Sequence, residues 1–338
     1  MKTIRITAPG KIETIETEKP ELKPGHVLLK VGYVGFCGSD LNTFRGLNPL
    51  VKLPVVPGHE IGAVIEERAA DVPSHLRKGM NATVNPYTSC GNCPSCRNSR
   101  PNACEFNQTL GVQRDGAMSE YIVIPWEKVI AGEKISVRDF ALVEPLSVGF
   151  HAVHRAEVSD IDTVVVMGCG MIGSGAIIRA AIRGAKVIAV DVDDRKLALA
   201  KRLGAEYTIN SVSENLHERI RDITGGSGAD VIIEAVGRPE TYIASVSEVA
   251  FTGRVVYIGY AKEKVSFDTS LFVKKEADIR GSRNAMPCDF KAVMEYIERG
   301  ACPVDELITA VYLPEEAQTA LERWSEKPGD VFRILIRF

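Results

Sequence analysis

The rhythm of hydrophobic and polar positions changes near residue 163. Before this point, short apolar runs such as residues 26–31 and 62–65 stand between stretches rich in glycine and proline. Residues 1–7 alternate polar and apolar side chains, which predicts a first strand. Short strands joined by long loops are typical of an irregular β domain. We therefore expect residues 1–145 to form such a domain.

After residue 163, continuous apolar runs alternate with helix-like segments. We predict strands at 163–167, 186–190, 230–234 and 254–258, and helices at 171–183, 194–203 and 239–250. This alternation indicates a parallel sheet covered on both faces. The C-terminal segment mixes helix-like and strand-like patterns, with helices expected near 288–299 and 314–326 and a strand at 332–336. The predicted fold class is α/β, with a doubly wound parallel-sheet domain at 146–284 and a β-rich domain formed by 1–145 and 285–338.

Composition and charge narrow the classes of partner. The chain has 338 residues, of which 45% are hydrophobic and 25% charged, as expected for a globular protein of about two domains. Lys and Arg total 41 against 44 Asp and Glu, which argues against nucleic acid or an anionic membrane as the main partner. The sequence has no run of about 18 apolar residues and no apolar signal-peptide core, so we expect a cytoplasmic protein.

A loop with four of the eight cysteines predicts a metal site. Cys90, Cys93, Cys96 and Cys104 have the spacing C-x2-C-x2-C-x7-C, with turn-forming residues between them. Four thiolates so spaced can hold zinc at about 2.3 Å in a closed tetrahedral site. An iron–sulfur cluster is the alternative, although its usual bacterial spacing ends in a shorter gap. We expect a structural zinc in a lobe at about 88–106.

Residues 168–173 have the pattern G-x-G-x-x-G between a predicted strand and a predicted helix. Gly168 suits the tight turn, Gly170 suits close approach to a pyrophosphate, and Gly173 suits close packing of helix and strand. Asp191 ends the next strand, where a carboxylate binds ribose hydroxyls and repels a 2′-phosphate. NAD is therefore favoured over NADP, although the nearby Arg195 leaves NADP open. The other expected cofactor contacts are Met171, Ile172 and Ile258.

Three further segments complete a family pattern. They are G-F-C-G-S-D at 35–40, G-H-E at 58–60 and E-P-L-S-V-G at 144–149. Together with the cysteine lobe and the glycine turn, their order resembles the zinc-dependent medium-chain dehydrogenase/reductase family over essentially the whole chain. The segment at 144–151 is most similar to the polyol and sugar-acid branch, which includes sorbitol and L-galactonate or L-gulonate dehydrogenases. The resemblance implies a GroES-like catalytic domain and a Rossmann NAD-binding domain.

The resemblance also implies a catalytic zinc. Cys37 and His59 match two of its ligands, and either Glu60 or Glu144 binds it directly. Asp40 would orient His59, and Ser39 would accept the alcohol proton. Asn42 stands where the family often has a histidine, so the route by which the proton leaves is open.

Substrate contacts are expected from Ser39, Glu144, Arg283 and Asn284. Arg283 could bind a carboxylate through two parallel hydrogen bonds, which would suit an aldonate. By resemblance, Arg333 would contact the cofactor pyrophosphate.

The predicted activity is NAD-dependent oxidation of a secondary alcohol of a polyol or sugar acid to a ketone, with two zinc ions per chain. One alternative is an amino-alcohol dehydrogenase of the L-threonine 3-dehydrogenase type. Another is a nucleotide-binding sensor or structural protein without catalysis, and it predicts a damaged catalytic set. By resemblance, the chain is expected to form a homotetramer or homodimer through strands near 254–281.

Overall fold

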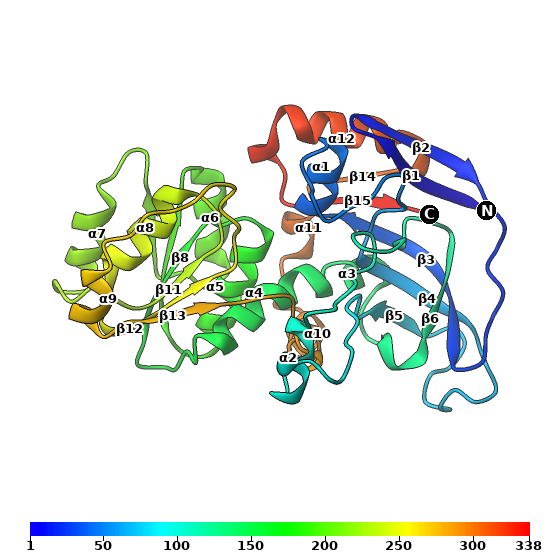
Figure 1. Cartoon of the computed structure of the whole chain (residues 1–338), viewed down its shortest axis with the longest axis horizontal. Helices are drawn as coiled ribbons and strands as arrows, with labels where there is room; N and C mark the ends of the chain where they lie inside the picture. The colour runs from blue at the N-terminus through cyan, green and yellow to red at the C-terminus, as the bar shows by residue number, and fades with distance from the viewer. The chain divides into compact units, whose positions relative to one another are not determined.

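The computed structural model describes residues 1–338, which divide into two compact units (Figure 1). The first unit comprises Met1–Glu144 and Val293–Phe338, and the second comprises Pro145–Ala292. The sequence prediction sets these boundaries after residues 145 and 284. The second observed boundary falls later, within helix α10 (Pro287–Glu298).

The first unit is built on β-strands. Its strands are β1 (Lys2–Ala8), β2 (Lys11–Glu16), β3 (His26–Phe36), β4 (Glu60–Arg68), β5 (Asn81–Val84), β6 (Tyr121–Pro125), β7 (Val129–Gly132), β14 (Ala310–Tyr312) and β15 (Ile334–Arg337). Its helices are α1 (Gly38–Phe44), α2 (Pro94–Arg97), α3 (Val137–Phe140), α11 (Val304–Leu307) and α12 (Ala317–Glu326), with 3-10 turns at Pro101–Ala103, Trp126–Lys128, Pro314–Glu316 and Pro328–Asp330. A seven-stranded sheet has the order β14-β15-β3-β4-β5-β7, with β6 beside β3, and β1 and β2 pair separately.

Strand β3 organises this unit because it pairs with β4, β6 and β15. Val27, Leu29 and Val31 on β3 are buried in one apolar core with residues of β4 and β15. The antiparallel register sets Gly35 near the end of β3 opposite Glu60 at the start of β4. A Cβ on Gly35 would lie 2.2 Å from Oε2 of Glu60, so only glycine permits this approach.

The second unit contains one fully parallel sheet between helices. Its strands are β8 (Thr163–Met167), β9 (Lys186–Asp191), β10 (Tyr207–Asn210), β11 (Ala229–Glu234), β12 (Val249–Tyr257) and β13 (Asp278–Gly281). Its helices are α4 (Val143–Arg155, which begins in the first unit), α5 (Met171–Ile182), α6 (Asp194–Arg202), α7 (Leu216–Ile223), α8 (Pro239–Glu248) and α9 (Ser270–Lys275). The strand order is β10-β9-β8-β11-β12-β13. This is the doubly wound 3-2-1-4-5-6 order, so the predicted fold class is confirmed.

Most predicted elements are present, and the differences lie at their ends. The helix expected at 239–250 stops at Glu248, because Val249 already pairs with Ala229 in the sheet. The helix expected at 314–326 begins with a 3-10 turn and becomes α-helical at Ala317. The short strands β5, β6 and β7 were not predicted. No helix has the length and apolar character that crossing a membrane requires.

Candidate functional site

Two loops of the first unit bring three potential metal ligands together. Cys37 follows β3 as the N-cap of α1, while His59 and Glu60 lie at the start of β4. The pairing of β3 with β4 sets these segments side by side. One donor atom from each of Cys37, His59 and Glu60 lies within 4.8 Å of the other two. Glu144 is not part of this set, although the sequence offered both glutamates as ligands.

His59 and Glu60 are buried, Cys37 is half-buried, and the charges of the three groups influence one another. Burial opposes ionisation of the Cys37 thiol, but its hydrogen bond to His59 outweighs this and lowers the pKa of Cys37. Burial likewise opposes a charged His59, yet the contact with Cys37 raises the pKa of His59 well above its usual value. Burial raises the pKa of Glu60. Their mutual dependence is typical of donors arranged for a cation.

Several buried polar atoms here lack a hydrogen-bond partner. They are Oγ of Ser39, Oδ1 of Asp40, Nδ1 of His59 and Oε1 of Glu60. Buried polar groups in proteins are normally satisfied, so unpartnered nitrogen and oxygen donors beside a thiol fit a metal ligand set. Sulfur, imidazole and carboxylate ligands are those that zinc accepts, and three protein ligands leave a position for substrate.

Asp40, which was expected to orient His59, makes no hydrogen bond to Nδ1 of that imidazole. Oδ2 of Asp40 instead accepts the backbone N–H of Cys37 at 2.8 Å, and its other oxygen has no partner. Burial raises the pKa of Asp40, and the charge of His59 and the bond from the N–H of Cys37 oppose this rise. Asp40 therefore positions the loop that bears Cys37, because a capping carboxylate three residues along can reach back to that N–H.

Tyr87 is a site residue that sequence reasoning missed. Its hydroxyl donates a hydrogen bond to Oε1 of Glu144, and both side chains are buried. Burial and the Glu144 carboxylate raise the pKa of Tyr87 well above its usual value, so the phenol remains a donor. The only sequence signal was an aromatic residue shortly before the cysteine lobe, which does not specify a partner.

Arg333 lies beside the same ligand set. Its Nε is 3.0 Å from Oε2 of Glu60, at ion-pair distance although the angle does not make a hydrogen bond, and its Nη1 donates to the carbonyl of Phe36 at 2.7 Å. Only 3% of Arg333 is exposed. The pairing with Glu60 was not predicted, and the expected pyrophosphate contact stays a prediction.

The four cysteines of the lobe converge on one point. Cys93 Sγ lies 3.5 Å from Cys96 Sγ and 3.8 Å from Cys104 Sγ. A tetrahedron with metal–sulfur bonds of about 2.3 Å has edges of roughly 3.8 Å, so this spacing fits zinc. Backbone N–H bonds lower the pKa of Cys93 to about 6, whereas burial and the neighbouring thiols raise the pKa of Cys96 to about 11. A cation is what would let all four ionise together.

The glycine turn of the second unit has the predicted geometry. Gly168 has φ +92°, and a Cβ on Gly173 would lie 1.7 Å from the carbonyl oxygen of Gly168. Nothing lies within 4 Å of the corresponding position on Gly170, the N-cap of α5, which leaves room for a ligand. No side chain caps α5, so the N–H groups near Met171 and Ile172 suit an anionic phosphate.

Asp191 ends β9 beside this turn, as expected. Its Oδ2 accepts the N–H of Cys169 at 2.7 Å, and its Oδ1 accepts the N–H groups of Val192 and Asp193. Arg195 forms an ion pair with Asp193 at 2.7 Å, and this carboxylate neutralises the charge of the guanidinium. Ile258 directly follows β12, and its N–H donates to the carbonyl of Glu234 at 2.9 Å.

Arg283 and Asn284 belong to the second unit, in the segment that follows β13. Both are half-buried, and Asn284 has a positive φ of 56°. The expected substrate contact of these two residues stays a prediction.

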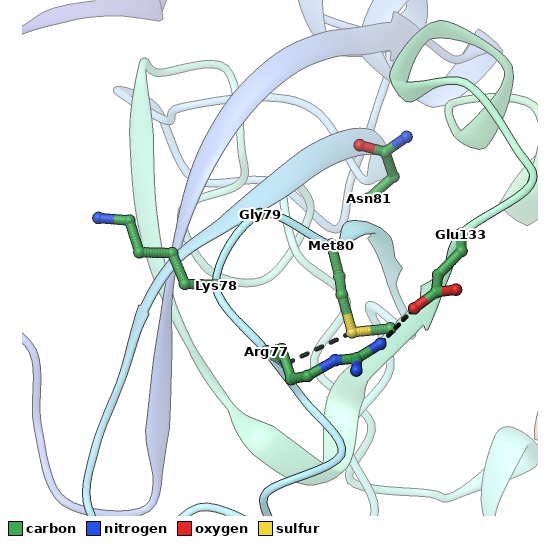
Figure 2. Close-up of a pocket in the computed structure, with 6 residues that line it drawn as sticks. All are labelled: Arg77, Lys78, Gly79, Met80, Asn81 and Glu133. Carbon is green, nitrogen blue, oxygen red and sulfur yellow. Dashed lines mark hydrogen bonds and ion pairs between the residues drawn. The ribbon is translucent and has the colours of Figure 1, made fainter.

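Neither of two surface cavities contains a predicted site residue. Figure 2 shows one of about 340 Å³, lined by Arg77, Lys78, Gly79, Met80, Asn81 and Glu133. Arg77 pairs with Glu133, and Lys78 points away from that pair (Figure 2). The other cavity, of about 470 Å³, is lined by Ser95, Asn98, Arg100 and Ala103 of the cysteine lobe.

Comparisons with known proteins agree with this geometry. The family model "Alcohol dehydrogenase GroES-like domain" matches residues 23–134, and "Zinc-binding dehydrogenase" matches residues 172–299. D-arabitol-phosphate dehydrogenase of Enterococcus avium is 31% identical over 343 residues, which cover 99% of this chain and 97% of that one. L-galactonate-5-dehydrogenase of Escherichia coli K12 is 32% identical over 313 residues, which cover 92% of each. The crystal structure of a short chain alcohol dehydrogenase (rspB) from Escherichia coli CFT073, complexed with NADH, is 29% identical with a TM-score of 0.91 and covers 100% of this chain and 99% of that chain.

Proposed function

The chain belongs to the zinc-binding alcohol dehydrogenase family, and from that premise we propose that it oxidises a secondary alcohol of a polyol or sugar acid to a ketone, with NAD as hydride acceptor. The observation that supports this most is the convergence of Cys37, His59 and Glu60 in the first unit. The glycine turn and Asp191 of the second unit support the choice of NAD as the cofactor. A non-catalytic sensor is disfavoured because no part of the expected catalytic set is missing.

In this proposal Cys37, His59 and Glu60 hold the catalytic zinc, because their donor atoms already lie together. Glu144 acts from outside this set, oriented by the hydroxyl of Tyr87. Arg333 balances the charge of Glu60, with its Nε 3.0 Å from Oε2 of that carboxylate. The four cysteines of the lobe hold a second, structural zinc with no position left for substrate.

Held by Cys37, His59 and Glu60, zinc would supply a Lewis acid that makes the substrate hydroxyl a better proton donor. Ser39 Oγ is buried without a partner and is the group that accepts the alcohol proton. Asn42 cannot take that proton further, because an amide is no base near neutral pH. The proton therefore leaves Ser39 through water.

The first turn of α5 binds the pyrophosphate of NAD, and Asp191 accepts hydrogen bonds from the adenosine ribose hydroxyls. The cofactor carries out the hydride transfer itself, while the protein orients the cofactor and supplies the electrostatic field around it. Asp191 disfavours NADP because its carboxylate would face the 2′-phosphate at short distance.

The substrate class rests on Arg283 and on the relatives. One relative is named for L-galactonate, a sugar acid, and another for D-arabitol phosphate. Arg283 is the group we assign to a carboxylate of the substrate, since a guanidinium matches that anion with two parallel bonds. An amino alcohol of the threonine type carries a cation beside its carboxylate and ranks second.

A substrate panel tests the function. Polyols, aldonates, polyol phosphates and L-threonine are each offered with NAD, and formation of NADH is followed by absorbance. We expect turnover of a polyol or an aldonate, and Cys37→Ser should abolish it while NAD binding persists. NADH formation from L-threonine alone would replace the proposal with the amino-alcohol reading. Full turnover by Cys37→Ser would remove zinc from the mechanism.

We further propose that the chain forms a homodimer or homotetramer through β13. This strand is the last in its sheet, so one of its edges has no partner strand. Ile279 on β13 is 44% exposed, and the nearby elements expose Phe251 and Val273. Light scattering on the purified protein would test this, and a monomer would refute it.

A reducing compartment such as the cytoplasm suits the two proposed zinc sites, because their cysteines must stay unpaired to bind zinc.

A further inference from the structure

Two histidines and an aspartate cluster in the second unit, apart from the residues assigned above. His151 and His154 lie in α4, and Asp289 lies in the first turn of α10. Nδ1 of His151 is 2.8 Å from Oδ2 of Asp289, and Nδ1 of His154 is 3.8 Å from Oδ1 of the same carboxylate. Each oxygen of one carboxylate thus faces a different imidazole.

The spacing in sequence explains this arrangement. Residues three apart on a helix project from the same face, so both imidazoles of α4 point toward α10. Their ring centroids lie 6.1 Å apart, with the ring planes at 85°. Asp289 is held in place because Oδ2 also accepts the N–H of Met286 at 2.9 Å.

The distances suit one small divalent cation. Ligands that bind such an ion at about 2.1 Å lie roughly 3.0 Å apart at a right angle and roughly 3.4 Å apart in a tetrahedron. Nδ1 of His151 and Oδ2 of Asp289 share a hydrogen bond of 2.8 Å, which is close to the first spacing and which an ion would replace. His154 needs to approach by only a few tenths of an ångström, and its 58% exposed side chain is able to do so.

We propose that His151, His154 and Asp289 form a third metal site, which takes a borderline cation such as Zn²⁺ or Ni²⁺ and links α4 to α10. Two imidazoles and a carboxylate favour such ions over Mg²⁺ or Ca²⁺, which prefer oxygen ligands. The exposure of His154 gives an ion access from solvent. This site is independent of the proposed dehydrogenase activity, because none of its residues belongs to the catalytic or structural zinc set.

Calorimetric titration with Ni²⁺ tests the proposal on protein that retains its tightly bound zinc. We expect about one nickel ion per chain to bind with micromolar affinity, and nickel to raise Tm by mass action. His154→Ala removes one imidazole at the surface, so the fold should persist while nickel affinity falls at least about tenfold. The matched control is His75→Ala, because His75 is also exposed and lies in the first unit.

Three results would overturn this site. One is the absence of saturable nickel binding in the wild-type chain. Another is equal nickel affinity in the wild-type chain and His154→Ala, which would place the bound ion elsewhere. Loss of affinity in His75→Ala as well would show nonspecific binding to surface histidines and would also refute the proposal.

Discussion

The backbone N–H of Cys169 donates a 2.7 Å hydrogen bond to Oδ2 of Asp191. This bond ties the middle of the glycine turn to the end of the neighbouring strand β9. The other oxygen of Asp191 accepts the N–H groups of Val192 and Asp193 at 2.7 and 3.1 Å. These bonds fix the carboxylate at the end of β9, where we propose that its charge discriminates between NAD and NADP.

Replacing Asp191 with Gly should shift coenzyme preference toward NADP. The change removes both the acceptor for the ribose hydroxyls and the charge that repels a 2′-phosphate. We expect the ratio of kcat/KM for NADP to that for NAD to rise at least about tenfold, which corresponds to roughly 1.4 kcal/mol. Asp160→Gly, at an exposed turn of the same unit, is the control. An unchanged ratio would mean that the ribose contact lies elsewhere.

Replacing Tyr87 with Phe should impair turnover more than folding. The buried carboxylate of Glu144 would lose the hydroxyl that donates to it, at a cost of about 1–3 kcal/mol. We expect kcat/KM to fall by about ten- to a hundredfold, and the d–d absorption of the cobalt-substituted enzyme to change. The control is Tyr121→Phe, whose ring lies under Lys19 and whose hydroxyl has no assigned role. Unaltered kinetics and cobalt spectrum would exclude Tyr87 from the site.

The sequence predicted candidate ligands but not their partners. The four lobe cysteines follow from residue type and spacing, because metal chemistry restricts both, whereas Cys37 and His59 were expected as ligands from the family resemblance. Tyr87 and Arg333 could not be found in this way. Each reaches its glutamate across the fold, Arg333 from 273 positions along the chain, and any polar residue could in principle serve. The bond of Asp40 to the backbone N–H of Cys37 was not predicted, because it depends on local loop geometry.

In the fold, too, some elements could be predicted from the sequence and others could not. The strands β8, β9, β11 and β12 of the second unit were predictable because buried parallel strands are continuous apolar runs, whereas β10, α4 and α7 were not predicted. The strands β5, β6 and β7 have only four or five residues each, too short to establish a period. The end of α8 at Glu248 depends on pairing of Val249 with Ala229, a contact between distant segments. Strand pairing between distant segments therefore determines these element ends and short strands, which the local sequence pattern does not predict.

Replacing Arg333 with Gln should destabilise the protein. The change breaks the buried ion pair between Arg333 and Glu60, and breaking such a pair typically costs about 3–5 kcal/mol. Loss of the 2.7 Å bond to the carbonyl of Phe36 adds to this cost. We expect a clear fall in Tm, measured by calorimetry, with Arg337→Gln at the exposed end of β15 as the control. An unchanged Tm combined with a raised KM for NAD would instead support the pyrophosphate contact implied by the family resemblance.

Replacing Cys104 with Ser should remove one zinc ion from the chain. Cys104 is fully buried in the lobe, and a hydroxyl is a much poorer zinc ligand than a thiolate. Elemental analysis should find about two zinc ions in the wild-type chain and about one in the variant, with a lower Tm because metal binding contributes directly to folding. Cys302→Ser is the matched control, since burial raises the pKa of Cys302 to about 12 and keeps that thiol protonated. Two zinc ions retained in Cys104→Ser would show that this cysteine is not a ligand, whereas a wild-type chain with only one would show that one of the two sites is misassigned.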